Sequence, residues 1–315
     1  MTLTLSFKME RGVFIISLDF EMMWGNARWK PEGYGRTHVA HVRDVIGGLL
    51  NLFEDYGVCA TFAVVGKIFL EDTVDDDIPG AYKDLYYAPD VVRQLKASPW
   101  IEVGIHSYAH HPHVTKEMFA DDLQKALETA KAEDICIKSM VFPNNYIKDG
   151  YLEECQKLGI TCYRGNPVKF YDARSAKRAV INRICRLLDA YVNIGGKTSY
   201  RLGKKENGLM NVRASRFLRP YTPMLFFAEK LRLRRIQQEM AYAARHHEVY
   251  HLWWHPHNFG ANMKKNFVFL EKILKTYKQL HQQYGMVSRT MGELAEKELV
   301  ELTVDSNVND NVKSF

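Results

Sequence analysis

The stretch WIEVGIHSYAHHPH, residues 100–113, joins a short apolar run to four histidines within eight residues. The run from Trp100 to Ile105 predicts a strand, so His106 and His110 follow a strand end, where α/β folds place their chemistry. Residues four apart on one helical turn, or on a tight turn before a helix, face the same way. Two imidazoles on one face are two of the three protein ligands of a catalytic zinc site. The stretch therefore predicts a metal centre, and the alternative is a surface histidine cluster with no ligand role.

A second predicted strand ends in two carboxylates. Residues 13–18, VFIISL, form a continuous apolar run, which is typical of a strand buried on both faces of a parallel sheet. Asp19 and Glu21 follow this run, and residues two apart on a strand point to the same side. Two carboxylates buried without partners are costly, so the pair indicates a metal or acid–base site. The alternative is that Asp19 caps the next segment and Glu21 is solvated.

The remaining chain alternates predicted strands with predicted helices, and this alternation favours parallel β/α units. The predicted helices span residues 37–56, 88–97, 115–135, 151–158 and 267–284, and the predicted strands span residues 59–65, 100–105, 139–146, 160–167 and 249–255. Thr115 is the expected N-cap of its helix, and Gly57 is the expected terminator of the first helix. We expect one domain over residues 1–302 and a disordered tail over residues 303–315.

The composition is that of an ordinary soluble protein, with 315 residues of which 46% are hydrophobic and 25% charged. The five cysteines form no CxxC pair, which favours a reducing compartment. We find no signal-peptide pattern at the start and no apolar run as long as a membrane span requires. These features predict a cytoplasmic protein.

Residues 168–236 interrupt the alternation and are strongly basic. Between residues 174 and 235 there are sixteen Lys or Arg and three Asp or Glu, whereas the whole chain has a formal net charge of +6. Residues 216–235 interleave arginine with apolar and aromatic side chains, a pattern that suits an anionic membrane surface or a phosphorylated substrate. We expect peripheral contact with an anionic membrane, at the inner surface, and no nucleic-acid partner. The alternative is an insertion whose bases are solvated and whose apolar residues pack on the barrel.

The segment EVYHLWWHPHNFG, residues 248–260, predicts a strand that ends in His255, Pro256 and His257. In a β/α barrel this strand end, the two ends described above and Arg164 converge at one rim. One carboxylate and two histidines hold a metal, a second carboxylate accepts a proton from water, and another histidine delivers one. This set indicates metal-assisted hydrolysis of an amide or an ester.

These motifs resemble the polysaccharide deacetylase family, the NodB-homology type of carbohydrate esterase. The matching stretches lie within residues 12–165 and 248–300 and are Ser17–Glu21, Ala60–Gly66, the His-Ser-x-x-His motif at 106–110, Phe142–Tyr146 and the strand ending at His255. The resemblance implies an irregular (β/α)7 barrel of the α/β class, with the basic insertion placed before the last catalytic strand. It also implies a divalent ion, most readily Zn²⁺, and the removal of acetyl groups from acylated sugars.

Carried over residue by residue, the resemblance makes His106, His110 and Glu21 the metal ligands and Asp19 the general base. The family's commoner first motif has two adjacent aspartates, the second of which binds metal. Phe20 stands at that position, so Glu21 takes the ligand role, as in the D-x-E variants. An exchange of roles between Asp19 and Glu21 stays open.

The resemblance also makes His255 the general acid and the backbone N–H of Tyr146 a donor to the oxyanion. The family's groove-wall motif usually carries an arginine and prolines, but residues 143–145 are Pro-Asn-Asn here, and Arg164 is a candidate for the missing charge. The expected substrate-binding residues are Trp24, Asn145, Arg164, His257 and Asn258.

The expected function is a metal-dependent deacetylase that acts on an N-acetylated sugar of a surface polysaccharide or of its lipid-linked or cytoplasmic precursor. Two alternatives stay open. One is hydrolysis of cyclic amides or ureides on the same fold. The other is a non-catalytic, metal-containing scaffold in polysaccharide biosynthesis.

Overall fold

A single curled, parallel sheet forms the centre of the computed structural model, which describes residues 9–26, 29–71, 77–111, 114–167 and 179–297. The strand order is β6-β5-β4-β3-β2-β1-β8-β7, and β9 also pairs with β1. The strands are β1 (Val13–Phe20), β2 (Ala60–Val64), β3 (Ile101–Ile105), β4 (Ser139–Met140), β5 (Cys162–Tyr163), β6 (Met210–Asn211), β7 (Arg216–Phe217), β8 (Val249–Trp254) and β9 (Val287–Arg289). This arrangement confirms the predicted α/β barrel class. The expected tail, residues 303–315, lies outside the described residues.

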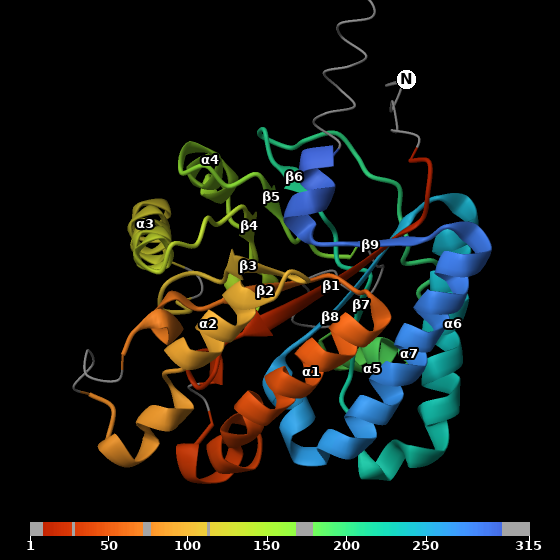
Figure 1. The fold of residues 1–315 in the computed structure, drawn as a ribbon, viewed down its shortest axis with the longest axis horizontal. Helices are drawn as coiled ribbons and strands as arrows, with labels where there is room; N and C mark the ends of the chain where they lie inside the picture. The colour runs from red at the N-terminus through yellow and green to blue at the C-terminus, as the bar shows by residue number, and fades with distance from the viewer. Residues whose placement is uncertain (1–8, 27–28, 72–76, 112–113, 168–178, 298–315) are drawn as a thin grey trace, which may run out of the picture.

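Helices surround this sheet, with α1, α2 and α7 covering one of its faces (Figure 1). The helices are α1 (Val42–Tyr56), α2 (Pro89–Ala97), α3 (Lys116–Ala132), α4 (Tyr151–Lys157), α5 (Ala179–Asp189), α6 (Glu229–His246) and α7 (Met263–Tyr284). Within the described parts of the chain, no helix is long and apolar enough to cross a membrane.

Strand β1 is the central strand, and all eight of its residues are buried. It pairs in parallel with β2 through residues 17–20, with β8 through residues 13–18 and with β9 through residues 13–15. Neighbours on both edges and cover on both faces explain why the sequence of β1 is an unbroken apolar run. Its carboxyl end therefore delivers Asp19 and Glu21 into the middle of the sheet rather than to its edge.

The predicted helix ends are partly confirmed. Gly57 adopts a left-handed φ of 60° and terminates α1, and the Thr115 hydroxyl accepts the N–H of Met118 at 3.2 Å to cap α3. However, α1 begins at Val42, because a π-turn at residues 31–35 and a 3₁₀ turn at residues 39–41 precede it. Helix α7 begins at Met263, four residues before the predicted start.

Helix α6 was not predicted, because charged residues occupy part of its buried face. Arg232, Arg235 and Glu239 are buried at helical spacing beside Ile236 and Met240. Charged side chains are almost never fully buried unless they are paired, so the sequence pattern resembles a solvated basic segment.

A buried ion network ties the insertion to the barrel. Arg216 on β7 and Arg235 on α6 both contact Glu239, at 3.1 Å and 2.7 Å, and both lie 3.6 Å from Asp189 at the end of α5. The Thr198 hydroxyl donates to Glu239 Oε2 at 2.6 Å. The expectation that the bases of the insertion are solvated is therefore wrong for Arg216 and Arg235.

We predict that Glu239→Gln lowers the free energy of unfolding by about 3 kcal/mol, because removing one partner leaves two buried guanidinium groups undercompensated. Urea denaturation followed by circular dichroism measures this change. Glu271→Gln, which breaks the exposed pair with Lys275 at 2.9 Å on α7, is the control and should leave the midpoint unchanged. Equal midpoints for both variants would contradict the anchoring role.

Candidate active site

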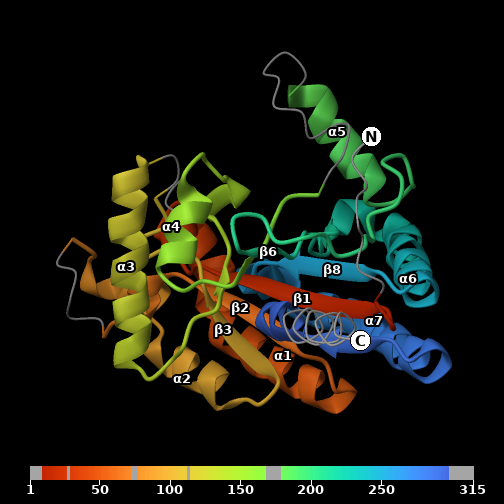
Figure 2. The same ribbon diagram turned by 90° about the horizontal axis from the view of Figure 1, so that it is seen from above.

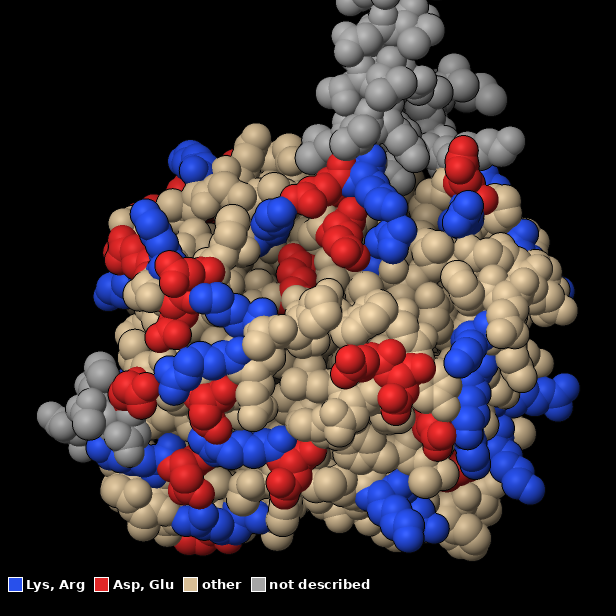
Figure 3. Space-filling model, viewed as in Figure 1, with Lys and Arg blue, Asp and Glu red and all other residues tan. Residues whose placement is uncertain are grey.

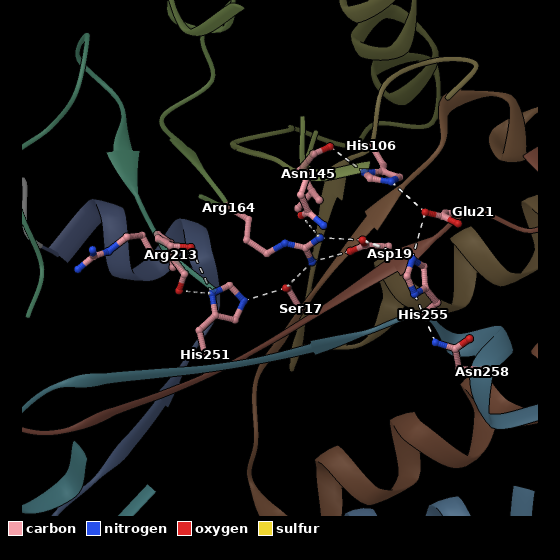
Figure 4. A network of polar contacts seen from close by, with 12 residues as sticks. Ser17, Asp19, Glu21, His106, Asn145, Arg164, Arg213, His251, His255 and Asn258 are labelled. Atoms are coloured by element: carbon pink, nitrogen blue, oxygen red, sulfur yellow. Dashed lines mark hydrogen bonds and ion pairs between the residues drawn. The ribbon is translucent and has the colours of Figure 1, made fainter. Parts of the chain in front are cut away.

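Three strand ends bring one carboxylate and three imidazoles together. Figure 4 shows the carboxylate, Glu21, with two of these imidazoles, His106 and His255. Glu21 Oε1 lies 3.1 Å from His106 Nε2, 3.3 Å from His110 Nε2 and 3.3 Å from His255 Nε2. Glu21, His106 and His110 are buried, while the side chain of His255 is 22% exposed. The first three residues thus form the closed side of the cluster, and His255 faces its open side.

The donor set fits a divalent metal ion. In a tetrahedral site with ligand bonds of about 2.1 Å, neighbouring ligand atoms lie about 3.4 Å apart. The separations between Glu21 Oε1 and the nitrogens of His106 and His110 are close to that value. His110 Nε2 is buried and has no hydrogen-bond partner among the described residues, as expected for a nitrogen that faces a metal. Asp19, Glu21 and His255 form a second group with compatible spacing, so Glu21 is common to both groups.

The ring of His106 is oriented by the neighbouring strand end. Its Nδ1 lies 2.7 Å from the carbonyl oxygen of Val141, so Nδ1–H donates there and Nε2 is left to face Glu21. A backbone acceptor on the far nitrogen is the usual way in which a metal-binding histidine is fixed.

The segment from His106 to His110 is a tight turn rather than a helical turn. Ser107 and His110 have φ values of 63° and 56°, and the His110 N–H donates to the Ser107 hydroxyl at 2.9 Å. Asp122 on α3 accepts the N–H groups of Tyr108 and of the following residue, at 2.6 and 3.2 Å. Sequence reasoning did not single out Asp122, because its partner is backbone fourteen residues earlier.

Room for the Glu21 carboxylate depends on a glycine. A Cβ built on Gly25 would lie 2.2 Å from Glu21 Oε2, well inside van der Waals contact. Gly25 belongs to a short 3₁₀ turn, Trp24–Asn26, which begins four residues after the end of β1. The backbone approaches the proposed ligand closely only because this residue has no side chain.

Arg164, which directly follows β5, holds Asp19. The guanidinium donates to Asp19 Oδ1 at 2.6 Å and to Oδ2 at 2.7 Å, and it also donates to the Asn145 side-chain oxygen at 2.8 Å. Arg164 is only 1% exposed. Arg164, an expected substrate-binding residue, thus contacts Asp19 and does not line the cleft described below.

A hydrogen-bonded relay supports Arg164 from the side away from Asn145. His251 Nδ1 lies 3.2 Å from the carbonyl oxygens of Val212 and Arg213, so this nitrogen carries the proton. His251 Nε2 accepts the hydroxyl proton of Ser17 at 2.7 Å, and Ser17 Oγ accepts from Arg164 Nη1 at 3.1 Å. Burial and then the charge of Arg164 lower the pKa of His251 to about 3, so its ring is neutral at physiological pH. Figure 4 shows this line of contacts ending at Asp19.

The charges around the cluster set the protonation states of three residues. Burial alone would raise the pKa of Asp19 and of Glu21, but Arg164 lowers the former and His255 lowers the latter, so both carboxylates are ionised. Burial alone would lower the pKa of His255, whereas the charges of Glu21 and Asp19 raise it above its ordinary value. The cluster therefore pairs ionised carboxylates with an imidazole whose protonated form they favour.

A cleft of about 680 Å³ opens over the cluster, a volume typical of small-molecule sites. Four of the expected substrate-binding residues line it, namely Trp24, Asn145, His257 and Asn258. Sequence reasoning missed four aromatic lining residues, Trp29, Tyr34, Phe217 and Trp253. A strand-end position could have indicated Phe217 and Trp253, whereas Trp29 and Tyr34 lie in irregular turns without a periodic signal.

Tyr146 does not take the place that was expected. Its N–H donates to the carbonyl oxygen of Pro143 at 3.0 Å, inside the 3₁₀ turn Pro143–Asn145. Tyr146 also lies outside the residues that line the cleft and contributes to a separate small pocket beside Tyr151. We therefore assign no oxyanion role to Tyr146.

We predict that Gly25→Ala weakens zinc binding by at least tenfold, because the added methyl group displaces the Glu21 carboxylate. Isothermal titration with Zn²⁺ measures the affinity directly. Gly47→Ala is the matched control, since a Cβ at Gly47 meets no atom within 4 Å. Unchanged affinity in Gly25→Ala would remove Glu21 from the metal site.

Part of the chain matches a known protein family. Residues 34–163 match the polysaccharide deacetylase family, a range that contains His106 and His110 but neither Glu21 nor His255. No curated protein matches the sequence.

Two solved structures share the fold. A protein from Mycobacterium smegmatis that is assigned by name to the polysaccharide deacetylases has a TM-score of 0.63 at 12% identity, covering 95% of this chain and 94% of its own. The GH57-type branching enzyme from Pyrococcus horikoshii has a TM-score of 0.56 at 10% identity, covering 89% of this chain and 69% of its own. Residues 34–163 therefore match a polysaccharide deacetylase domain, and the two solved structures show that the chain shares their fold.

Proposed function

We propose that the protein is a metal-dependent deacetylase that removes acetyl groups from N-acetylated sugars of a surface polysaccharide or of its lipid-linked or cytoplasmic precursor. One observation carries the proposal. Glu21 lies within 3.3 Å of two buried histidine nitrogens, beside a second carboxylate, Asp19, that is ionised and fixed by Arg164. The family match supports deacetylation as the reaction class. The volume of the cleft supports entry of a small polar group of the substrate.

Glu21, His106 and His110 would hold the metal ion. Two imidazoles and one carboxylate form a set that suits Zn²⁺. When bound, the ion supplies Lewis acidity, which polarises the acetyl carbonyl and lowers the pKa of water. Exchange of roles between Asp19 and Glu21 is disfavoured, because Arg164 occupies both oxygens of Asp19 whereas Glu21 Oε1 faces the histidines.

Asp19 acts as the general base. The bidentate contact with Arg164 keeps the carboxylate ionised and fixes its position beside the cleft. Each carboxylate oxygen has two lone pairs, so Asp19 can accept a water proton while it stays bound to Arg164. The guanidinium cannot deprotonate in place of Asp19, so the proton that leaves water resides on the carboxylate.

His255 acts as the general acid. Its Nε2 lies 3.7 Å from Asp19 Oδ2 and 3.3 Å from Glu21 Oε1, and it lines the open cleft. The raised pKa of His255 favours the protonated ring, which is the form needed to protonate the departing amine nitrogen. A neutral ring would leave the amine as a poor leaving group.

The cleft walls suit a sugar. Trp29 stacks on Tyr34 with ring centroids 5.3 Å apart, and Trp253 and Phe217 stand on the side of His255. Asn145 and Asn258 add amide groups between these rings. Flat apolar faces with a few polar side chains among them are a common lining for a small polar ligand.

We predict that His106→Ala loses both bound zinc and acetate release from N-acetylated oligosaccharides. Asp19→Asn should keep the metal and reduce acetate release by about 10²–10⁴-fold, because only the base is lost. Elemental analysis and an acetate assay on the same samples measure both properties. The pair of variants separates a metal ligand from a proton acceptor.

Three outcomes would contradict this proposal. Full acetate release by Asp19→Asn would remove the base from the mechanism. Bound zinc with hydrolysis of cyclic imides and no acetate release would favour a cyclic-amide hydrolase. Bound zinc with neither activity would favour a scaffold.

We also predict that Ser17→Ala and His251→Phe lower kcat by roughly tenfold while KM and zinc content stay unchanged, because the relay positions Arg164 and touches no ligand. Ser288→Ala is the matched control, as Ser288 is a buried β-strand serine that bonds the Cys59 backbone. A similar fall in kcat for the control would show that the loss reflects disturbed packing and not the relay.

A further inference from the structure

Helix α5 turns an apolar face toward solvent. Ile181, Ile184 and Leu188 are exposed, Ile181 by 60%, and their spacing of three and four residues places them on one side of the helix. The buried residues of this region include Asn182 and Asp189, which are polar. A surface helix ordinarily points its apolar side inward, so the arrangement here is inverted.

A second exposed apolar group lies at the 3₁₀ turn Pro223–Ala228, directly before α6. Met224, Phe226 and Phe227 are 84%, 66% and 70% exposed, and Leu231 on the first turn of α6 is exposed as well. Single exposed apolar residues are common on soluble proteins, but a contiguous group of large ones marks an interaction site.

Buried contacts fix the two groups on the same part of the molecule. Asp189 ends α5 and lies 3.6 Å from Arg235 of α6, and Arg235 also donates to the Asn193 side chain at 2.8 Å. Arg232 of α6 donates to the carbonyl oxygen of Arg219, just before the turn. Figure 2 shows α5 standing out from the body on the side where α6 lies.

Basic residues border the exposed apolar groups. Arg183 on α5 and Lys230 and Arg234 on α6 are exposed. The acidic residues of 179–235 are engaged elsewhere, because Asp189 and Glu229 pair with buried arginines and Glu206 accepts the Tyr163 hydroxyl. In Figure 3, Lys and Arg line the lower right edge, where Figure 1 places α6. This charge distribution complements an anionic partner.

We propose that α5 and the turn 223–228, with their bordering cations, form a docking surface for an anionic lipid bilayer. The projecting apolar side chains enter the boundary between headgroups and acyl chains, and the cations contact lipid phosphates. A convex projection suits a lipid surface, whereas a protein partner would have to provide a matching groove. This inference does not rest on the proposed deacetylation, since docking and acetate release are measured separately.

Vesicle flotation of the full chain tests the docking surface. We expect the protein to float with phosphatidylcholine vesicles that contain phosphatidylglycerol and to remain unbound with phosphatidylcholine alone. Binding should fall as salt rises, because the contribution of exposed charges is screened. No flotation with the anionic vesicles at low salt would overturn the proposal.

Two sets of variants locate the surface. The double variant Phe226→Ser with Phe227→Ser should abolish flotation, and Lys230→Glu with Arg234→Glu should weaken it by more than roughly fivefold for each cation. Met118→Ser and Lys125→Glu on α3 are the matched controls, since both residues are exposed and α3 lies across the molecule from α5 and α6 in Figures 1 and 2. The controls should float as the unaltered protein does.

The remaining outcomes also decide the question. Equal loss of flotation in the α3 controls would show non-specific adsorption and overturn the assignment. A dimer in sedimentation analysis that the Phe226 and Phe227 variants disrupt, without vesicle binding, would assign this surface to a second copy instead. Unchanged flotation of the double serine variant would exclude the turn 223–228 from the contact.

Discussion

The buried ion pair between Arg164 and Asp19 is the contact on which the site depends. Two carboxylates leave β1 on the same side, and each would favour protonation if it were buried alone. Arg164 compensates Asp19 with two short hydrogen bonds, while three imidazoles surround Glu21. The two acids therefore receive different partners and different tasks. Arg164 keeps the carboxylate of Asp19 ionised and able to accept a proton. The imidazoles around Glu21 make its carboxylate part of a metal site.

The parts of the site that could be predicted from the sequence are those carried by the carboxyl ends of strands. Asp19 lies near the end of its strand, and Glu21, His106 and His255 each follow a strand. These strands are recognisable by their apolar runs, and parallel strands bring such ends to one rim. The task of Arg164 could not be predicted in this way. It comes from β5, four strands away from β1 in the sheet order, and only the curl of the sheet brings the guanidinium to Asp19.

Features without periodicity were missed or placed wrongly for local reasons. The turn that carries His110 depends on left-handed backbone at non-glycine residues, which sequence patterns seldom reveal. The N–H of Tyr146, for which an oxyanion role was expected, donates to the carbonyl oxygen of Pro143 in a 3₁₀ turn. Helix α6 was overlooked because Arg232 and Arg235 occupy positions where an apolar residue would have signalled a buried face.

The arginines of the basic insertion have two different roles, one in the interior and one at the surface. Arg216 and Arg235 are buried against Asp189 and Glu239, and these ion pairs attach the insertion to the barrel. Arg183 and its exposed neighbours keep their charge at the surface, beside apolar side chains that find no cover among the described residues. The buried pairs remove the local acids from the surface and so leave its positive charge uncancelled. The same network that anchors α5 and α6 thereby sets the sign of the face they present.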